Sequence, residues 1–161
     1  MDPVSLFISV GGLLLSIYAV LTAQNVQSAV NETIKKINIQ RDLSEIDDIL
    51  KKLNKAKSAA SIWIAGAVEQ SQVGRDCLSD LRIVREAEDA LAVWVPADMN
   101  QASKKRMEKE LENLRTYCEA ISSPQNNENQ WNGVVVSIQS LIRLLREHSR
   151  TLENSQLISA K

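Results

Sequence analysis

Hydrophobic and polar positions divide this chain into an uncharged, apolar start and a series of amphipathic stretches. Between Pro3 and Asn31 there is no Asp, Glu, Lys, Arg or His, and the most apolar part, VSLFISVGGLLLSIYAVLTA, runs from Val4 to Ala23. About 20 such residues are enough for a helix to cross a hydrocarbon core of about 30 Å. The pattern therefore predicts an N-terminal transmembrane helix.

Two other interpretations of this segment stay open. A cleavable signal peptide normally begins with positive charge, whereas only Asp2 precedes the apolar run. A buried helix of a soluble bundle is the second, because serines and glycines dilute the hydrophobicity. Lys35, Lys36 and Arg41 follow the span and no Lys or Arg precedes it, so the positive-inside rule places the rest of the chain in the cytosol. The expected location is the inner or plasma membrane, crossed once, with the N-terminus outside.

Small residues recur on one face of the predicted span at intervals of four and three. They form a seam consisting of Ser5, Ser9, Gly12, Ser16, Ala19 and Ala23. Small side chains let transmembrane backbones approach closely, and serines can hydrogen-bond across the contact. The spacing continues through Val26, Val30, Thr33 and Ile37. The seam predicts either self-association of the helices or the lining of a narrow pore, and chance spacing in a short segment is the third explanation.

The remaining apolar positions recur at helical spacing and predict further helices. The first helix is expected from about Pro3 to Lys57 with a bend near Asn38. The apolar stretch over 58–73 is expected either as a second helical segment inside the bundle or as a continuation of the first helix, and its apolar core, Ala59 to Val68, is too short to span a membrane. Three more are expected, over about 75–95, 98–121 and 130–157. Pro96 ends the first of these three, and Asp98 with Gln101 suggests a capping box at the start of the next. The loop SSPQNNEN separates the last two.

The expected fold is all-α: a transmembrane helix that continues into an antiparallel cytosolic helical bundle, assembled as an oligomer. We divide the chain into the transmembrane helix (1–25), an extended helix carrying the oligomerisation seam (26–57), the helical bundle (58–157) and a frayed tail (158–161). The chain has 161 residues, of which 24% are charged, and its net charge of −1 excludes a strong global attraction to nucleic acid or anionic lipid. Any anion site must therefore be a local patch.

The sequence contains few side chains that are typical of catalytic or metal sites. Cys77 and Cys118 are far apart in sequence, and together with the single histidine, His148, they do not make a zinc site. We expect buried, reduced thiols, with a disulfide as the alternative, and an exposed or half-buried structural role for His148. No nucleotide-binding glycine loop, nucleophile elbow or metalloprotease motif occurs. The sequence predicts no enzyme, no cofactor and no metal site.

Arginines at helical spacing are the candidate anion-binding groups. Arg143, Arg146 and Arg150 share one face of the last helix, and a second set shares a side of the helix over 75–95: Arg75, Arg82 and Arg85. The planar guanidinium binds phosphate in a bidentate manner. A nucleotide, an oligonucleotide or a lipid headgroup is one interpretation, and a solvated surface interspersed with glutamates is the other.

The first 21 residues, MDPVSLFISVGGLLLSIYAVL, resemble the start of HeLo and Bell domains. Those are helical, membrane-targeting cell-death domains that begin with an acidic residue, a proline and a hydrophobic helix containing Gly and Ser. The whole plan is similar, in architecture only, to small transmembrane effectors of bacterial antiphage defence, including the Hailong type. That resemblance implies a nucleotide-regulated channel that acts by abortive infection.

We therefore expect an oligomeric membrane effector that forms or gates an ion pathway and is regulated by a nucleotide or oligonucleotide on its cytosolic bundle. Its partners would be the membrane and further copies of itself, with a tetramer as a candidate size. The alternatives are a membrane-tethered scaffold or adaptor for a protein partner, and a soluble bundle that inserts into the membrane on activation.

Overall fold

The computed structural model describes the chain over residues 3–64, 76–94, 96, 99–121 and 128–158, with most side chains before residue 26 and those of 157 and 158 left out. Within these ranges there are four helices: α1 (Pro3–Ser61), α2 (Cys77–Val93), α3 (Gln101–Ala120) and α4 (Glu128–Ile158). Over these ranges there is no strand, so the predicted all-α class is confirmed. The chain forms two compact units, Met1–Arg41 and Asp42–Lys161.

The first unit consists of the N-terminal two thirds of α1. Its helical backbone is uninterrupted through Asn38, where we had expected a bend. Among the described residues, no helix combines the length and the apolar character that a membrane crossing requires. Four of the six predicted seam residues, Ser5, Ser9, Gly12 and Ala19, have side chains outside the described set, whereas Ser16 and Ala23 are exposed.

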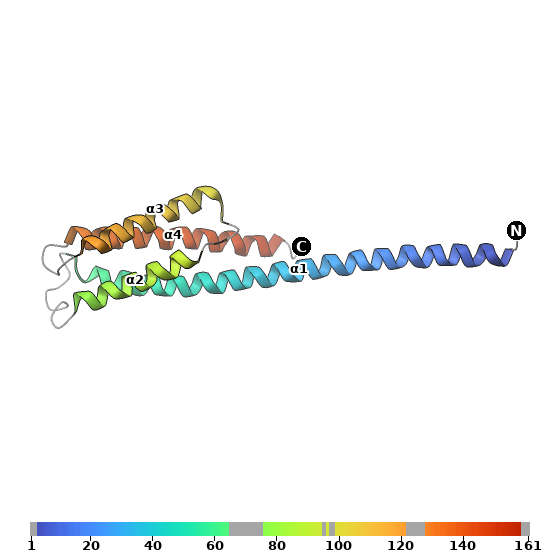
Figure 1. Ribbon diagram of the computed structural model, residues 1–161, viewed down its shortest axis with the longest axis horizontal. Helices are drawn as coiled ribbons and strands as arrows, with labels where there is room; N and C mark the ends of the chain where they lie inside the picture. Colours follow the sequence, from blue (N-terminus) through green and yellow to red (C-terminus); the bar gives the residue numbers. More distant parts are fainter. Residues whose placement is uncertain (1–2, 65–75, 95, 97–98, 122–127, 159–161) are drawn as a thin grey trace. The chain divides into compact units, whose positions relative to one another are not determined.

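The second unit is a bundle formed by the end of α1 together with α2, α3 and α4. These helices alternate in direction along the chain (Figure 1), which confirms the antiparallel bundle. Its core consists of apolar side chains that recur at helical spacing, because each helix buries one stripe. The largest fully buried side chains are Trp131, Ile46, Leu53, Leu91, Met107, Leu114, Ile138, Leu141, Leu145, Val84, Val134 and Cys118.

The end of α1 lies four residues beyond the expected Lys57. Ala56, Ala59 and Ala60 are buried and favour the helix. The hydroxyls of Ser58 and Ser61 donate to the carbonyls four residues earlier, at 3.0 and 2.7 Å, instead of competing with the helix from a turn. We expected the stretch over 58–73 either as a second helical segment or as a continuation of the first helix. Its first four residues continue α1, and most of the rest lies outside the described residues.

Helix α3 begins with a different cap from the one predicted. Asn100 is the N-cap, and its side-chain oxygen accepts a hydrogen bond from the backbone N–H of Ser103 at 2.8 Å. Gln101 is the first helical residue, so it cannot be the third-position partner of Asp98. Asp98 itself lies outside the described residues. Helix α2 is capped in a similar way by Asp76, which accepts from the N–H of Leu78 at 3.0 Å.

Tryptophans join the helices at one end of the bundle. The ring of Trp63, directly after α1, stacks on that of Trp131 in α4, with centroids 6.0 Å apart. The Nε1–H of Trp63 also donates to Oδ2 of Asp80 in α2 at 3.0 Å, and this carboxylate is only 6% exposed. Because a buried carboxylate needs hydrogen-bond donors, this contact fixes α2 against the end of α1.

Helices α3 and α4 come close together at Gly133. A Cβ atom at this position would stand 2.6 Å from the ring of Tyr117. Arg115 of α3 forms a second interhelical contact, because its Nε donates to Oε1 of the buried Glu88 in α2 at 3.0 Å. Helix α3 therefore contacts both α2, through Arg115, and α4, at Gly133.

Both cysteines are buried and free, as predicted. Burial raises the pKa of the Cys118 thiol to about 12, and the nearby Glu88 carboxylate adds to the effect. Burial also raises the pKa of Cys77, with smaller contributions from Asp76 and Asp80. Neither thiol is therefore poised to react as a thiolate near neutral pH.

Candidate anion-binding pocket and the exposed apolar stripe

Three of the predicted arginines line one pocket on the bundle surface. Arg143, Arg146 and Arg150 lie three and four residues apart on α4, so they share one face of the helix. The pocket lies between this face and α1 and has a volume of about 490 Å³. Its remaining lining residues are Asn54 and Lys57 of α1 and Gln139, Ile142 and Glu147 of α4.

The charge of this pocket is strongly positive for so small a surface. Lys57 and the three arginines contribute four positive charges and Glu147 one negative charge, which leaves a formal charge of +3. Glu147 lies 3.9 Å from Nε of Arg143, and both side chains are largely exposed. An exposed pair of this kind is weak, so it leaves the pocket attractive to an anion. Asn54 and Gln139 add neutral amide groups, although Nδ2 of Asn54 already donates to the Leu50 carbonyl at 2.8 Å.

The α1 side of the pocket could not be found from the sequence. Lys57 and Asn54 are about ninety residues away from the arginines in the chain, and nothing in the local pattern joins the two segments. The only sequence feature that pointed to this pocket was the spacing of the three arginines on α4. In the sequence analysis Lys57 was only the expected end of the first helix and not a candidate anion-binding residue.

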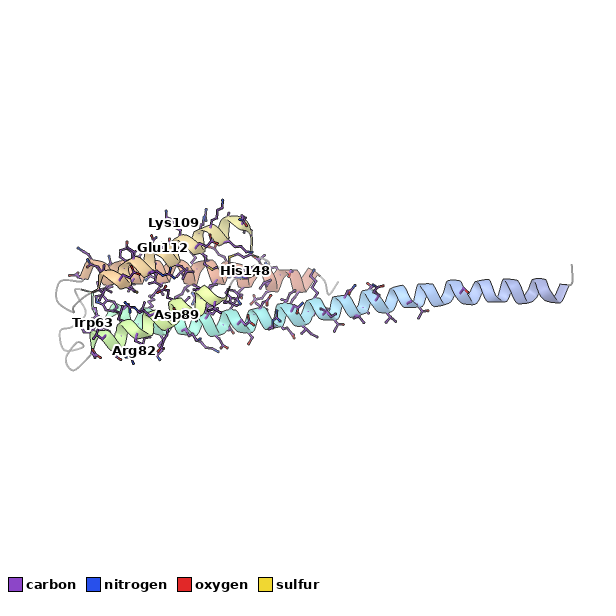
Figure 2. All side chains as sticks on the ribbon, viewed as in Figure 1. Trp63, Arg82, Asp89, Lys109, Glu112 and His148 are labelled. Carbon is purple, nitrogen blue, oxygen red and sulfur yellow. The ribbon has the colours of Figure 1, made fainter. Side chains whose placement is uncertain are left out.

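The second predicted arginine set does not join this pocket. Arg82 and Arg85 are exposed on α2, and Arg75 lies outside the described residues. Figure 2 shows Arg82 on α2, whose residues do not contribute to the pocket between α1 and α4. Arg85 instead lies near Cys118, where its positive charge opposes the rise in the pKa of that thiol. The six predicted anion-binding arginines therefore do not form a single site within the described chain.

His148 lies on the same helix as the arginines (Figure 2) but is not part of the pocket surface. It is 8% exposed, so the expectation of an exposed or half-exposed side chain was wrong. The helical period explains the error, because His148 follows Leu144 and Leu145 by four and three residues and shares their buried face.

A stripe of exposed apolar side chains is the second feature with functional meaning, and it lies on α1 in the first unit. Val26, Val30, Ile34 and Ile37 are between 49% and 58% exposed. They continue the spacing of the predicted seam, with Ile34 as an addition. Thr33 is also exposed, and its hydroxyl donates to the Ala29 carbonyl at 2.8 Å within the same helix. The Thr33 hydroxyl beside the stripe is thus hydrogen-bonded within its own helix. It does not need a hydrogen-bond partner from another helix that packs on the stripe.

Metal chemistry finds no support in the described part of the chain, where no group of three or more His, Cys, Asp and Glu side chains is placed to hold an ion. A search of protein-family models, of curated proteins and of solved structures gave no match to this chain.

Proposed function

We propose that this protein is an oligomeric membrane effector, in which N-terminal helices associate and form or gate an ion pathway. The observation that carries the proposal is the stripe Val26, Val30, Ile34 and Ile37, which is exposed on a single helix. Four large apolar side chains at intervals of four, four and three are typical of a helix that packs on another helix. An exposed apolar stripe of this length is costly in water unless a partner covers it.

The apolar N-terminal sequence supplies the membrane part of the proposal. The run from Val4 to Ala23 is long enough to span a bilayer and carries small residues on the face that the stripe continues. If helices from several copies associate along the seam and the stripe, Ser5, Ser9 and Ser16 of each copy would lie around one common axis. Their hydroxyls would then offer the polar lining that an ion pathway needs.

The bundle supplies a place for a regulatory ligand. The pocket of Lys57, Arg143, Arg146 and Arg150 suits the phosphate groups of a nucleotide or oligonucleotide, because several guanidinium groups converge on one small surface. By the resemblance in architecture, such a ligand would open the pathway, and the loss of membrane potential would stop phage propagation in the infected cell. A bacterial defence role is thus part of the proposal.

The seam is tested by substitution in the full chain reconstituted into liposomes. Gly12→Leu and Ser9→Leu place a bulky side chain in the contact, so we expect loss of ion flux and a change in the mass of the detergent-solubilised particle. Leu14→Phe is the matched control, because helix geometry puts residue 14 on the face opposite to the seam. Unchanged flux and mass in both seam variants would show that the seam is not the contact.

The pocket is tested with fluorescent ATP as the probe and anisotropy as the measurement. Arg146→Glu replaces attraction with repulsion, and we expect binding to weaken by about tenfold or more, since one charge-assisted hydrogen bond contributes about 1.5–3 kcal/mol. Arg82→Glu is the matched control, because it makes the same charge change on an exposed surface away from the pocket. Equal affinities for the two variants would rule out the pocket as the ATP site.

The alternative, a membrane-tethered adaptor, is favoured by one observation on the bundle. Val93 at the end of α2 is 88% exposed and lines a groove between α1 and α2, which is the type of surface that a partner helix covers. An adaptor needs only an anchor, so a foreign transmembrane helix in place of residues 1–25 would preserve its function. The channel proposal requires that this replacement abolishes ion flux.

A further inference from the structure

A second charged surface lies on the opposite side of α1 from the basic pocket. The groove between α1 and α2 has a volume of about 780 Å³, and its rim carries Glu45 and Asp48 from α1 and Glu86 and Asp89 from α2. Figure 2 shows Asp89 on α2. Lys52 and Lys55 also line the groove, which leaves a formal charge of −2 from four carboxylates and two ammonium groups. We call this surface the acidic groove.

The acidic groove has an apolar floor and, at one end, a hydrogen bond between its two helices. Ile49 and Ala87 are buried beneath it, and Val93 is largely exposed within it. At the end of α2 the Nε1–H of Trp94 donates to Oε2 of Glu45 at 2.7 Å, which joins α1 to the C-cap of α2. The groove is therefore lined by two helices, which one exposed hydrogen bond joins at this end.

The two charged surfaces flank α1 on opposite sides. Glu45 lines the acidic groove and Asn54 lines the basic pocket, and they are separated by nine residues, which is about two and a half helical turns. Their side chains consequently leave α1 in opposite directions. A copy of the bundle thus presents negative charge on one flank of α1 and positive charge on the other.

Part of the charge on each flank is already engaged within the chain: Asp48 pairs with Lys51 at 2.9 Å, Glu45 accepts from Trp94, and Arg143 pairs with Glu147. The remaining charges are available for a partner. Within the described residues, Glu86 and Asp89 form no hydrogen bond or ion pair, and neither do Arg146 and Arg150. A +3 pocket and a −2 groove on the same chain are complementary to each other. Surfaces that differ and lie on opposite flanks favour a head-to-tail contact, which closes into a ring when the rotation between copies permits.

We propose that the basic pocket of one copy docks on the acidic groove of the next copy around the oligomer. This inference rests on the proposed function, since it assigns the cytosolic contact of the same assembly. Each exposed ion pair contributes little, so these contacts set the orientation and register of the bundles, while the apolar stripe holds the helices together. An anionic ligand would compete with the neighbour's carboxylates for Arg146 and Arg150, which gives the ligand a direct means of rearranging the ring.

The test is disulfide trapping in the full-length, detergent-solubilised protein. Asp89→Cys and Arg146→Cys are introduced into two differently tagged copies, which are co-expressed and oxidised. The native Cys77 and Cys118 are buried, so they contribute little background. We expect a covalent dimer that carries both tags in the mixture of the two variants, and at most a trace when either variant is expressed alone.

Lys109→Cys in place of Arg146→Cys is the matched control. Lys109 is an exposed basic residue on α3 (Figure 2) and belongs to neither charged surface. We expect no covalent dimer of Asp89→Cys with this variant. Equal trapping by Lys109→Cys, or trapping of Asp89→Cys with itself, would overturn the head-to-tail docking.

The mass of the particle separates failure of the docking from failure of the assembly. A particle of several subunits that gives no disulfide between residues 89 and 146 would overturn the docking and leave the proposed oligomer standing. A particle that contains one subunit would overturn the proposed function, and the docking with it.

Discussion

At the scale of single residues, two indole N–H groups donate to carboxylates of very different burial. Trp63 donates to Asp80, which is 6% exposed, and Trp94 donates to the exposed Glu45. A buried carboxylate that loses a donor is not compensated by water, whereas an exposed one is. The two contacts look alike in geometry but should differ in their effect on the free energy of unfolding.

We expect Trp63→Phe to lower the free energy of unfolding by about 1–3 kcal/mol. Trp94→Phe makes the same chemical change beside an exposed acceptor and should cost less than about 1 kcal/mol. Urea unfolding of the full chain in mild detergent, followed by circular dichroism, measures both values. If Trp94→Phe lowered the free energy of unfolding more than Trp63→Phe, the hydrogen bond to the buried Asp80 would not be more stabilising than the one to the exposed Glu45.

The Cys118 thiol makes stability depend on alkaline pH. Its pKa is raised to about 12 in the folded chain, mainly by burial, whereas an unfolded cysteine titrates near about 8.5. Above that pH the unfolded state loses a proton that the folded state retains. The contribution of Cys118 to stability is therefore complete below about pH 8.5 and is lost as the pH rises towards 12.

We expect the difference in stability between the unsubstituted chain and Cys118→Ala to shrink between pH 8 and pH 11. The change should be at most about 1.4 kcal/mol per pH unit. Comparison of the two proteins removes the contributions of other titrating groups, which both chains share. A difference that stays constant over this pH range would contradict the raised pKa.

At the scale of helices, the close approach of α3 and α4 depends on one missing side chain. A Cβ at Gly133 would stand 2.6 Å from the Tyr117 ring, which is 36% exposed and can move only partly. We expect Gly133→Ala to destabilise the chain by about 1–2 kcal/mol, because the steric cost exceeds the gain of about 1 kcal/mol from better helix propensity.

Tyr117→Ala provides the matching background for this substitution. Without the ring, Gly133→Ala meets no obstacle and should stabilise the chain by up to about 1 kcal/mol. Thermal unfolding of the four proteins gives the coupling between the two positions. If the effects of the two substitutions on the free energy of unfolding were additive, the Tyr117 ring would not be the obstacle to a side chain at position 133.

The helices were predictable because their apolar stripes are regular and their ends carry recognisable stop signals. The expected helix over 75–95 became Cys77–Val93, and that over 130–157 became Glu128–Ile158. The end of α1 was left open between Lys57 and a continuation into the next stretch, because apolar spacing alone does not mark a boundary there. The bonds of the Ser58 and Ser61 hydroxyls to carbonyls within the helix show that it continues to Ser61. The cap of α3 was missed because two candidates, Asp98 and Asn100, lie close together.

The candidate site was only half predictable. Arginine spacing on α4 identified one wall of the pocket, since residues three and four apart in a helix are neighbours. The other wall, Asn54 and Lys57, depends on which helix packs beside α4, and a single sequence does not encode that pairing locally. The acidic groove was missed for the same reason, because Glu45 and Asp89 belong to different helices.

At the scale of the whole molecule, we propose one partner, a second copy of the chain, for both the apolar stripe and the charged flanks of the bundle. In the proposed assembly the stripe would attract one α1 helix to another, and the charged flanks would set the order in which bundles meet. A membrane span in the N-terminal sequence would align the copies in one direction and raise their local concentration. The proposed assembly in a membrane depends on all of these features together.

The most direct test is the mass of the full-length particle after extraction from membranes. We predict that detergent is needed and that light scattering, corrected for bound detergent, gives one uniform particle of several subunits. A protein that purifies without detergent as a monomer would contradict the account, because neither a membrane span nor a covered stripe would then exist.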